Sequence, residues 1–452
     1  MRRVVVVVLD GMRRDLLDEE RTPALAKFKR RAQVFESHRS MFPSATRVVS
    51  ASFATGCTPA RHELQGNSLA LLENGRLVHH DAGRPDFLQH KRSVTGRSLA
   101  VPTMAERLAP HGGMILFSNV SPGAAYAHDP DGFGHVYHRA GSFAPGRRRL
   151  EGAQALQIGQ DAAGEAEMAS RFIDEVLFER KPPLAILWMS EPDATQHARP
   201  LGSPEHLAVL RQADANAARV FAAVDRLRDE GEDVLLVACS DHGHQTVSRV
   251  VDVEGELVAA GLKASRESQD VVTPSSGTSS LVYVHPDHGG KVQAIGAFLA
   301  TRDWVDRVVP PDELGSIGQA PRHGLAYAVA LKSDEESNPF GIPGRSCEAK
   351  PAEGKDTHLG CGQHGGLARY EQMPFLMING PGFAAGTVST APTSPRACCS
   401  ICRSRGTAWT AEGCRPDARQ TELGFNRSRH RRRSRAGPRD RWGRRASRPV
   451  RS

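Results

Sequence analysis

The sequence predicts an α/β fold in which a mostly parallel central sheet carries helices on both faces. Short continuous apolar runs, typical of strands that are buried on both faces, recur along the chain. Amphipathic runs long enough to form helices lie between them, and this alternation is typical of a parallel sheet. The chain has 452 residues, which is long enough to bury a large core.

Five apolar runs are predicted to form the strands of this sheet: 4–9, 113–119, 184–190, 233–240 and 374–380. Amphipathic runs at 165–180 and 206–230 are predicted to be helices. Residues 246–357 interrupt the pattern with shorter strand-like pieces, so we expect a small inserted subdomain there, within a catalytic domain of residues 1–387. In sheets of this kind, ligands bind outside the carboxyl ends of the strands.

The start of the chain, "MRRVVVVVLDG", resembles a signal peptide because two arginines precede an apolar run. Residues 4–9 are shorter than an h-region of roughly 7–15 residues and far shorter than a spanning helix of about 20. Asp10 and Gly11 follow the run in place of a cleavage site. We therefore expect a buried strand, a cytoplasmic protein and no membrane partner.

The net charge of +8 comes from the C-terminal tail. Residues 388–452 contain 17 arginines, no lysine and four acidic residues, a net charge of +13, which leaves −5 for residues 1–387. The catalytic domain is therefore mildly acidic, and its charge gives no indication of a nucleic-acid-binding surface. We expect a small-molecule substrate and no nucleic-acid partner.

Acidic residues and histidines follow three of the predicted strands, where they would meet at one edge of the sheet. Together with one histidine near the end of the domain, they make six candidate metal ligands: Asp10, Asp193, His197, Asp241, His242 and His364. Asp193 and His197 are four residues apart, so one helical turn places both on the same face. His364 lies between glycines in "CGQHGG", which would let the backbone approach an ion.

Aspartate oxygens and histidine nitrogens in this number suit zinc or manganese better than calcium or thiolate-bound metals. Two ions at about 3.5–4 Å would use all six ligands and would still need a bridging oxygen from the nucleophile or the substrate. The sequence therefore predicts two divalent metal ions. Zinc is the preferred metal, and manganese is the alternative.

The segments "LDG", "EPDATQH", "SDHGH" and "GQHGG" resemble the metal motifs of the alkaline phosphatase superfamily, and specifically of its type I phosphodiesterase/nucleotide pyrophosphatase family. The resemblance extends from residue 4 to about residue 387. It implies that one metal is held by Asp10, Asp241 and His242 together with the nucleophile. It also implies a second metal, with these ligands: Asp193, His197 and His364.

In proteins of this superfamily, the nucleophile lies at the N-terminus of a helix, nine residues before a Thr-Gly pair. Here the pair is Thr55-Gly56, which places the nucleophile at Thr46, with Ser44 as the alternative. A threonine hydroxyl needs activation, which metal coordination would supply, so Thr46 is also a predicted metal ligand. The helix N-terminus would favour a phosphoryl group.

Cys57 begins "CTPAR", which fits the C-x-P-x-R signature of sulfatases, in which the cysteine becomes a formylglycine nucleophile. Cys57 follows the Thr-Gly pair, however, and lies eleven residues after Thr46. We therefore predict that Cys57 is not the nucleophile.

The resemblance also implies an asparagine 21 residues after the nucleophile, whose amide holds a phosphoryl oxygen. Asn67 occupies this position, and such a donor would stabilise charge in the transition state. Arg47 is a candidate substrate-binding residue, with an outward-facing surface arginine as the alternative. The chain departs from the family at Glu63, where a glycine is usual, and this change would reshape the loop before Asn67.

Taken with the resemblance, the residues predict a two-metal hydrolase of phosphodiesters or nucleotide pyrophosphates that acts through a covalent phospho-threonine at Thr46. A phosphomonoesterase, a phosphonate hydrolase or a phosphomutase on the same scaffold is the alternative. Another is a non-catalytic binding protein with a nucleic-acid-binding basic tail. The motifs do not specify the substrate, the oligomeric state or the physiological metal.

The tail has two explanations. It could be a basic, disordered extension, which its composition allows. Alternatively, a shift of reading frame near residues 387–392 replaced the helix that closes the fold in the family, because "EQMPFLMINGPGFAAGT" turns abruptly to Cys, Ser and Arg. The cysteines of "CCSIC" lack a second His/Cys pair at finger spacing, so no zinc finger is expected.

Overall fold

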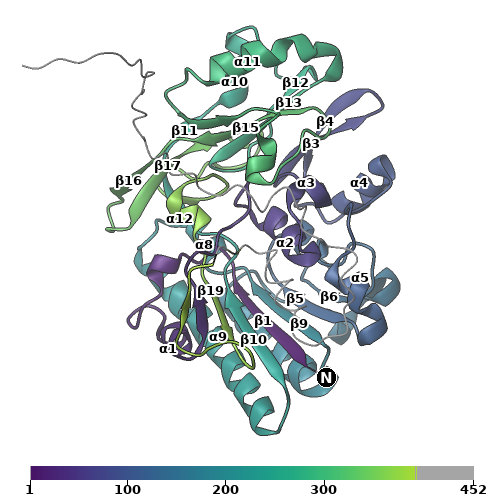
Figure 1. Ribbon diagram of the computed structural model, residues 1–452, viewed down its shortest axis with the longest axis vertical. Helices are drawn as coiled ribbons and strands as arrows, with labels where there is room; N and C mark the ends of the chain where they lie inside the picture. The colour runs from purple at the N-terminus through teal and green to yellow at the C-terminus, as the bar shows by residue number, and fades with distance from the viewer. Residues whose placement is uncertain (1, 392, 394–452) are drawn as a thin grey trace, which may run out of the picture. The chain divides into compact units, whose positions relative to one another are not determined.

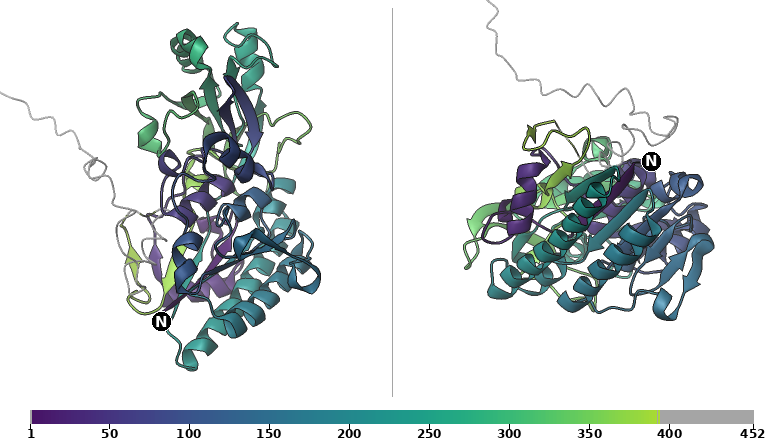
Figure 2. Two further views of the ribbon diagram at one scale, coloured as in Figure 1. Left: turned by 90° about the vertical axis from the view of Figure 1, so that its right-hand side faces the viewer. Right: turned by 90° about the horizontal axis from the view of Figure 1, so that it is seen from below.

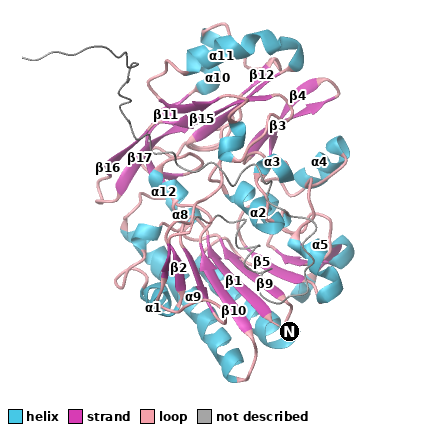
Figure 3. Ribbon diagram, in the orientation of Figure 1, coloured by secondary structure: helices cyan, strands magenta, loops and turns pink. Residues whose placement is uncertain are grey.

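A ten-stranded sheet runs through the centre of the computed structural model, which describes residues 2–391 and 393 (Figure 1, Figure 3). Its strands are β1 Arg3–Leu9, β2 Gln33–Phe35, β5 Met114–Ser118, β6 His135–Tyr137, β7 Ser142–Ala144, β8 Arg148–Leu150, β9 Leu184–Met189, β10 Val234–Cys239, β19 Leu376–Asn379 and β20 Val388–Ser389. They lie in the order β20-β2-β19-β10-β1-β9-β5-β6-β7-β8. Strands β10, β1, β9, β5 and β6 are mutually parallel, which confirms the predicted fold class.

Helices cover both faces of this sheet, because successive side chains of its central strand enter different cores (Figure 2). Val5 and Val7 of β1 pack in one core and Val6 and Val8 in the other. The first core contains residues of α1 Pro23–Arg31, α7 Ala162–Arg171 and α9 Pro204–Asp229, and the second contains residues of α2 Thr46–Thr55, α5 Met104–Leu108 and α6 Pro122–Tyr126. Burial on both faces explains why the strands are continuously apolar.

Both predicted helices are present, but the second half of the first one is π-helical. The run 206–230 forms α9, whereas the run 165–180 forms most of α7 and a π-helical segment, Phe172–Arg180. The predicted strand 374–380 forms β19, which pairs antiparallel with β10. Because of this direction, the start of β19, not its end, lies beside the carboxyl end of β10.

Two smaller four-stranded sheets lie beyond the carboxyl ends of the central strands (Figure 1). One contains β11 Gln245–Val251, β16 Ser333–Ser337, β17 Pro343–Ala349 and β18 Gly362–Gln363; the other contains β12 Val271–Val272, β13 Ser279–Val284, β14 Val305–Val309 and β15 Leu325–Leu331. Helices α10 Val253–Ala259 and α11 Val292–Leu299 pack on the second sheet. The predicted subdomain, 246–357, contains most of these elements but not β18.

A hairpin of β3 Ser68–Glu73 and β4 Arg76–Asp81 joins this region to the rest of the fold. Leu69 and Leu71 of the hairpin share a core with Leu281 and Tyr283 of β13. Short helices flank the hairpin and the site: α3 Pro59–His62, α4 Phe87–Thr95, α8 Asp193–Ala198 and α12 Arg369–Gln372.

Most of the tail, 392 and 394–452, lies outside the described residues. The two explanations offered for the tail concern these residues and stay predictions. Its first residues are described, and Val388–Ser389 pair with β2 as strand β20. Among the residues that the structure describes, no helix combines the length and the apolar character needed to span a bilayer.

Candidate functional site

The carboxyl ends of three neighbouring parallel strands bring the predicted ligands together (Figure 1). Asp10 follows β1 directly, Asp241 follows β10 after one serine, and Asp193 is the first residue of α8, shortly after β9. The parallel register aligns the last residues of these strands, so their loops leave the sheet at the same edge. His364 reaches this edge separately, on the loop that follows β18.

One group of potential ligands combines Asp10, Asp241 and His242, which are all buried. His242 Nε2 lies 3.2 Å from Asp241 Oδ2 and 3.5 Å from Asp10 Oδ1. The hydroxyl of Thr46 reaches the same place, with Oγ1 3.2 Å from His242 Nε2 and 3.5 Å from Asp10 Oδ1. Four predicted residues therefore surround one small volume.

The second group combines Asp193, His197, His244 and His364. Asp193 Oδ2 lies 3.5 Å from His197 Nε2, one helical turn away, and Asp193 Oδ1 lies 3.5 Å from His364 Nε2. The two groups are adjacent, since the rings of His242 and His364 stack with centroids 3.7 Å apart. The predicted division of the ligands into two sets therefore matches two neighbouring clusters.

Crowding of the carboxylates perturbs their pKa values. Burial raises the pKa of Asp10 well above its usual value, and the charges of Asp241 and Asp193 raise it further. Burial also raises the pKa of Asp241, against the influence of His242. Burial acts in the same direction on Asp193, but the surrounding imidazoles, His197 foremost, outweigh it and hold its pKa well below the usual range. Cations placed between these groups would relieve the repulsion.

Backbone carbonyls fix the orientation of the histidines. The Nδ1 atoms of three histidines lie at hydrogen-bonding distance from carbonyl oxygens: His197 from Gly362 at 3.1 Å, His242 from Gly243 at 3.1 Å and His364 from Ser44 at 2.7 Å. With Nδ1–H donating to a carbonyl, Nε2 of each neutral ring keeps its lone pair and faces the carboxylates. This arrangement is typical of metal-ligating histidines.

The two clusters fit divalent metal ions. Asp241 Oδ2 is buried and accepts no hydrogen bond from any residue that the structure describes. A buried carboxylate oxygen of this kind is costly unless a cation satisfies it. Carboxylate oxygens and imidazole nitrogens are ligands for both zinc and manganese, so the donor set suits one divalent ion at each cluster without selecting between these metals.

Two residues outside the predicted set also contact the candidate ligands. His244 Nε2 lies 2.6 Å from Asp193 Oδ1, and burial lowers the pKa of His244 to about 3. A neutral ring that donates Nε2–H to Asp193 would orient this carboxylate. Trp188 Nε1 donates to Asp10 Oδ2 at 3.0 Å. The second histidine of "DHGH" was a signal for His244, but Trp188 is indistinguishable from a core residue in the sequence.

Thr46, the alternative nucleophile Ser44 and the rejected Cys57 have different surroundings. Thr46 is the first residue of α2, and its neighbour Ala45 is extended, so the hydroxyl lies at the helix N-terminus. The Ser44 hydroxyl is instead buried against the backbone, donating to Gly366 O at 3.1 Å. Cys57 is buried beyond the other end of α2, after Gly56 in the left-handed conformation that ends the helix.

A cavity of about 430 Å³ opens onto Thr46, and both other predicted substrate-binding residues line it. Asn67 Oδ1 accepts a hydrogen bond of 3.3 Å from the backbone N–H of Arg47. The Arg47 side chain donates through Nε to Ser121 Oγ at 3.2 Å, and its Nη2 lies 3.8 Å from Asp81 Oδ1. Arg47 therefore points along the cavity wall and not outward from α2.

Gly365, which follows His364, is needed for the packing of its loop. A Cβ on Gly365, whose φ is +125°, would lie 1.7 Å from the carbonyl oxygen of Ser276. Glycine is therefore required at position 365 because two loops approach each other closely there. The close approach holds the loop that carries His364 against residues 276–278.

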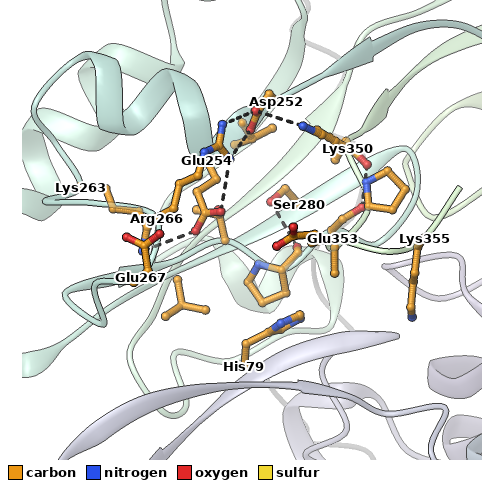
Figure 4. Close-up of a pocket in the computed structure, with 18 of the residues that line it drawn as sticks. His79, Asp252, Glu254, Lys263, Arg266, Glu267, Ser280, Lys350, Glu353 and Lys355 are labelled. Atoms are coloured by element: carbon orange, nitrogen blue, oxygen red, sulfur yellow. Dashed lines mark hydrogen bonds and ion pairs between the residues drawn. The ribbon is translucent and has the colours of Figure 1, made fainter. Parts of the chain in front are cut away.

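A larger cavity, of about 800 Å³, lies between the hairpin β3–β4 and the smaller sheets (Figure 4). Figure 4 shows Asp252 between Arg266 and Lys350, and ion pairs join it to both. Lys355 pairs with Asp81 at 2.6 Å. Because these charges are already paired and none of the predicted ligands or nucleophiles lines this cavity, the smaller one contains the candidate site.

Comparison with known proteins identifies the relatives of this fold. The model of a family described as type I phosphodiesterase/nucleotide pyrophosphatase matches residues 4–310. Among curated protein sequences, none matches the chain.

Similar solved structures include the murine ectonucleotide pyrophosphatase/phosphodiesterase 5, as an inactive variant in complex with AMP. It has 18% identity and a TM-score of 0.61, with coverage of 89% of this chain and 94% of that one. Phosphonoacetate hydrolase from Sinorhizobium meliloti, in complex with phosphonoformate, has 16% identity and a TM-score of 0.62, with coverage of 88% and 94%. At these identities, the similarity establishes the fold alone.

Proposed function

Because the chain belongs to the type I phosphodiesterase/nucleotide pyrophosphatase family, we propose that it hydrolyses phosphate esters at the cavity beside Thr46. The observation that carries this proposal is the position of the Thr46 hydroxyl, at a helix N-terminus and within 3.5 Å of both Asp10 and His242. The first cluster of potential metal ligands contacts this hydroxyl, and the second adjoins the first and lines the same cavity.

Asp10, Asp241 and His242 would hold one divalent ion near Thr46, and the other ligands predicted for a second ion are Asp193, His197 and His364. When bound, the ions would supply positive charge that lowers the pKa of the threonine hydroxyl and offsets the charge of the phosphoryl group. Zinc is our first choice and manganese the second. His244 and Trp188 would orient the carboxylates of Asp193 and Asp10 through the hydrogen bonds described above.

In the proposed reaction, Thr46 Oγ1 forms a bond to phosphorus while the bond from phosphorus to the leaving oxygen breaks. An alcohol or a nucleotide leaves, and water then hydrolyses the phospho-threonine and restores the hydroxyl. The hydroxyl of Thr46 lies at the start of α2, where backbone N–H groups and the helix dipole would favour the negative charge of a phosphoryl group. Asn67 and Arg47 supply further donors to the phosphoryl oxygens, so positioning and charge account for most of the rate.

A second candidate, hydrolysis of a small phosphonate or monoester, is favoured by the lining of the cavity. Three arginines line it, Arg47, Arg84 and Arg139, and none of the described lining residues is Phe, Tyr or Trp. Aromatic side chains are the usual platforms on which nucleobases stack. A cavity lined by arginines and without such a platform suits a compact substrate that carries a second acidic group, and phosphonoacetate is a suitable probe.

Paired variants of Thr46 and Cys57 test the assignment. Thr46→Ala should lower turnover of bis-nitrophenyl phosphate by about 10³-fold or more, because the attacking oxygen is lost. Cys57→Ala is the matched control and should retain the wild-type rate, since this side chain lies at the far end of α2. Both proteins should show the far-UV circular dichroism of the wild type.

The substrate is tested with the same preparations, loaded with zinc or manganese, on four compounds: bis-nitrophenyl phosphate, nitrophenyl phosphate, nitrophenyl sulfate and phosphonoacetate. Faster turnover of phosphonoacetate or the monoester would select the second candidate. An active Thr46→Ala protein together with an inactive Cys57→Ala protein would refute the proposal. It would instead support a sulfatase in which Cys57 supplies the nucleophile.

A further inference from the structure

A separate cluster of potential metal ligands comes from the hairpin β3–β4 and from helix α4. It contains Glu73, the last residue of β3, His80 in β4 and His90 in α4. None of these residues lines the cavity at Thr46, and none belongs to the two clusters of the candidate site. The cluster is therefore distinct from the proposed catalytic centre.

The nitrogen atoms of both histidines converge on a single carboxylate oxygen. Glu73 Oε1 lies 2.5 Å from His80 Nε2 and 3.0 Å from His90 Nε2. The two imidazole rings have centroids 4.7 Å apart, and all three potential ligand atoms lie within 4.8 Å of one another. Such convergence allows one ion to contact all three side chains after small rotations.

Partial burial gives the cluster the environment of an accessible metal site. The side chains of Glu73 and His80 are 16% and 18% exposed, and that of His90 is 41% exposed. The ring of Phe87 lies 5.8 Å from that of His80 and shields one side. A bound ion would therefore have three protein ligands and an open side toward solvent.

We propose that Glu73, His80 and His90 bind a divalent transition-metal ion, of which zinc is the probe of choice. Two imidazole nitrogens and one carboxylate oxygen are a common donor set for zinc with three protein ligands. The same donors disfavour calcium and magnesium, which prefer oxygen ligands.

An ion at this position would support the candidate site from a distance. The hairpin runs from Asn67, immediately before β3, to Asp81, the last residue of β4, and both residues contact Arg47. Cross-linking Glu73 and His80 of the hairpin to His90 of α4 would hold both strands in place. The role is structural, so loss of the ion should reduce stability and leave the chemistry intact.

Zinc counting on the full chain tests the proposal. Chelator-treated protein is saturated with zinc, passed through a desalting column and analysed for metal per chain. His80→Ala, His90→Ala and Glu73→Gln should each bind one zinc fewer than the wild type, or bind that zinc at least about tenfold more weakly. Turnover of bis-nitrophenyl phosphate should remain at the wild-type level in the zinc-loaded variants.

His79→Ala is the matched control, because His79 is an exposed neighbour on β4 that does not belong to the cluster. It should bind as much zinc as the wild type. If His80→Ala fails to fold, His90→Ala tests the same ion at a more exposed ring. Equal zinc content and affinity in the wild type, His90→Ala and Glu73→Gln would overturn the proposal and leave Glu73 as an acceptor of two hydrogen bonds only.

Discussion

Glu165 in α7 is a buried acid whose ionisation should control stability near neutral pH. Its side chain is 1% exposed, and Oε1 accepts hydrogen bonds from Ser190 N at 2.9 Å, Ser190 Oγ at 2.7 Å and Asn119 Nδ2 at 3.3 Å. Oε2 has no hydrogen-bond partner among the described residues. Burial raises the pKa of Glu165 from 4.5 to about 7, against these hydrogen bonds.

The expected effect follows from the proton that the folded state retains. Between pH 4.5 and about pH 7, folded Glu165 is largely protonated while the unfolded chain has released this proton. The contribution of Glu165 to the free energy of unfolding is therefore greatest below pH 4.5 and is lost as the pH rises through about 7. The difference between these pKa values corresponds to about 3 kcal/mol. The free energy of unfolding of Glu165→Gln should not show this decline with pH, because glutamine stays neutral.

Urea unfolding of the wild type and Glu165→Gln at pH 5, 6, 7 and 8 measures the effect. The variant should gain stability relative to the wild type as the pH rises, by up to about 3 kcal/mol across this range. Glu167→Gln is the control, because Glu167 is an exposed residue of the same helix and should show no such trend. A difference between Glu165→Gln and the wild type that does not vary with pH would refute this reasoning.

Two further predictions concern the candidate site. Asp193→Ala and His364→Ala should each lower the bound metal by about one ion per chain, because both residues belong to the same one of the two clusters at the candidate site. Metal analysis and loss of activity on chelation check this, and a fully active metal-free preparation would contradict it. Asp81→Asn should raise KM about fivefold with little change in kcat, because a partly exposed partner of Arg47 contributes about 1 kcal/mol. Steady-state kinetics distinguish this from a fall in kcat alone, which would contradict a positioning role for Asp81.

The central strands were predictable because burial on both faces makes them continuously apolar. Strand ends in a parallel sheet also meet at one edge, so Asp10, Asp193 and Asp241 could be placed together without coordinates. The edge strands were not predicted, since β2, β6, β7 and β8 have three residues each and carry no periodicity that distinguishes them from loops. The antiparallel direction of β19 was equally hidden, because a buried apolar run has the same composition in either direction.

Within the site, the sequence specified which residues come together better than it specified what each side chain does. The two histidines of "DHGH" are chemically equivalent in the sequence. In the structure, His242 directs Nε2 toward two carboxylates and Thr46, whereas His244 Nε2 contacts Asp193. The Nδ1 atoms differ as well: that of His242 lies 3.1 Å from the carbonyl oxygen of Gly243, whereas that of His244 has no hydrogen-bond partner among the described residues. The pattern of residues contains no information about these contacts. The direction of Arg47 depends in the same way on Ser121 and Asp81, which are distant in sequence.

Glu63 illustrates how a departure from a family motif can be absorbed without disturbing the site. It ends α3 with φ 63° and ψ 25°, the left-handed conformation that glycine adopts without steric strain. A non-glycine residue in this conformation destabilises the fold by about 1 kcal/mol. The ion pair of Glu63 with the exposed Arg322, at 3.5 Å, recovers only part of this cost. Asn67 is held independently, by its own hydrogen bond to the backbone of Arg47 at the start of α2. The substitution therefore affects stability at the end of α3, while the donor that would contact the phosphoryl group keeps its position.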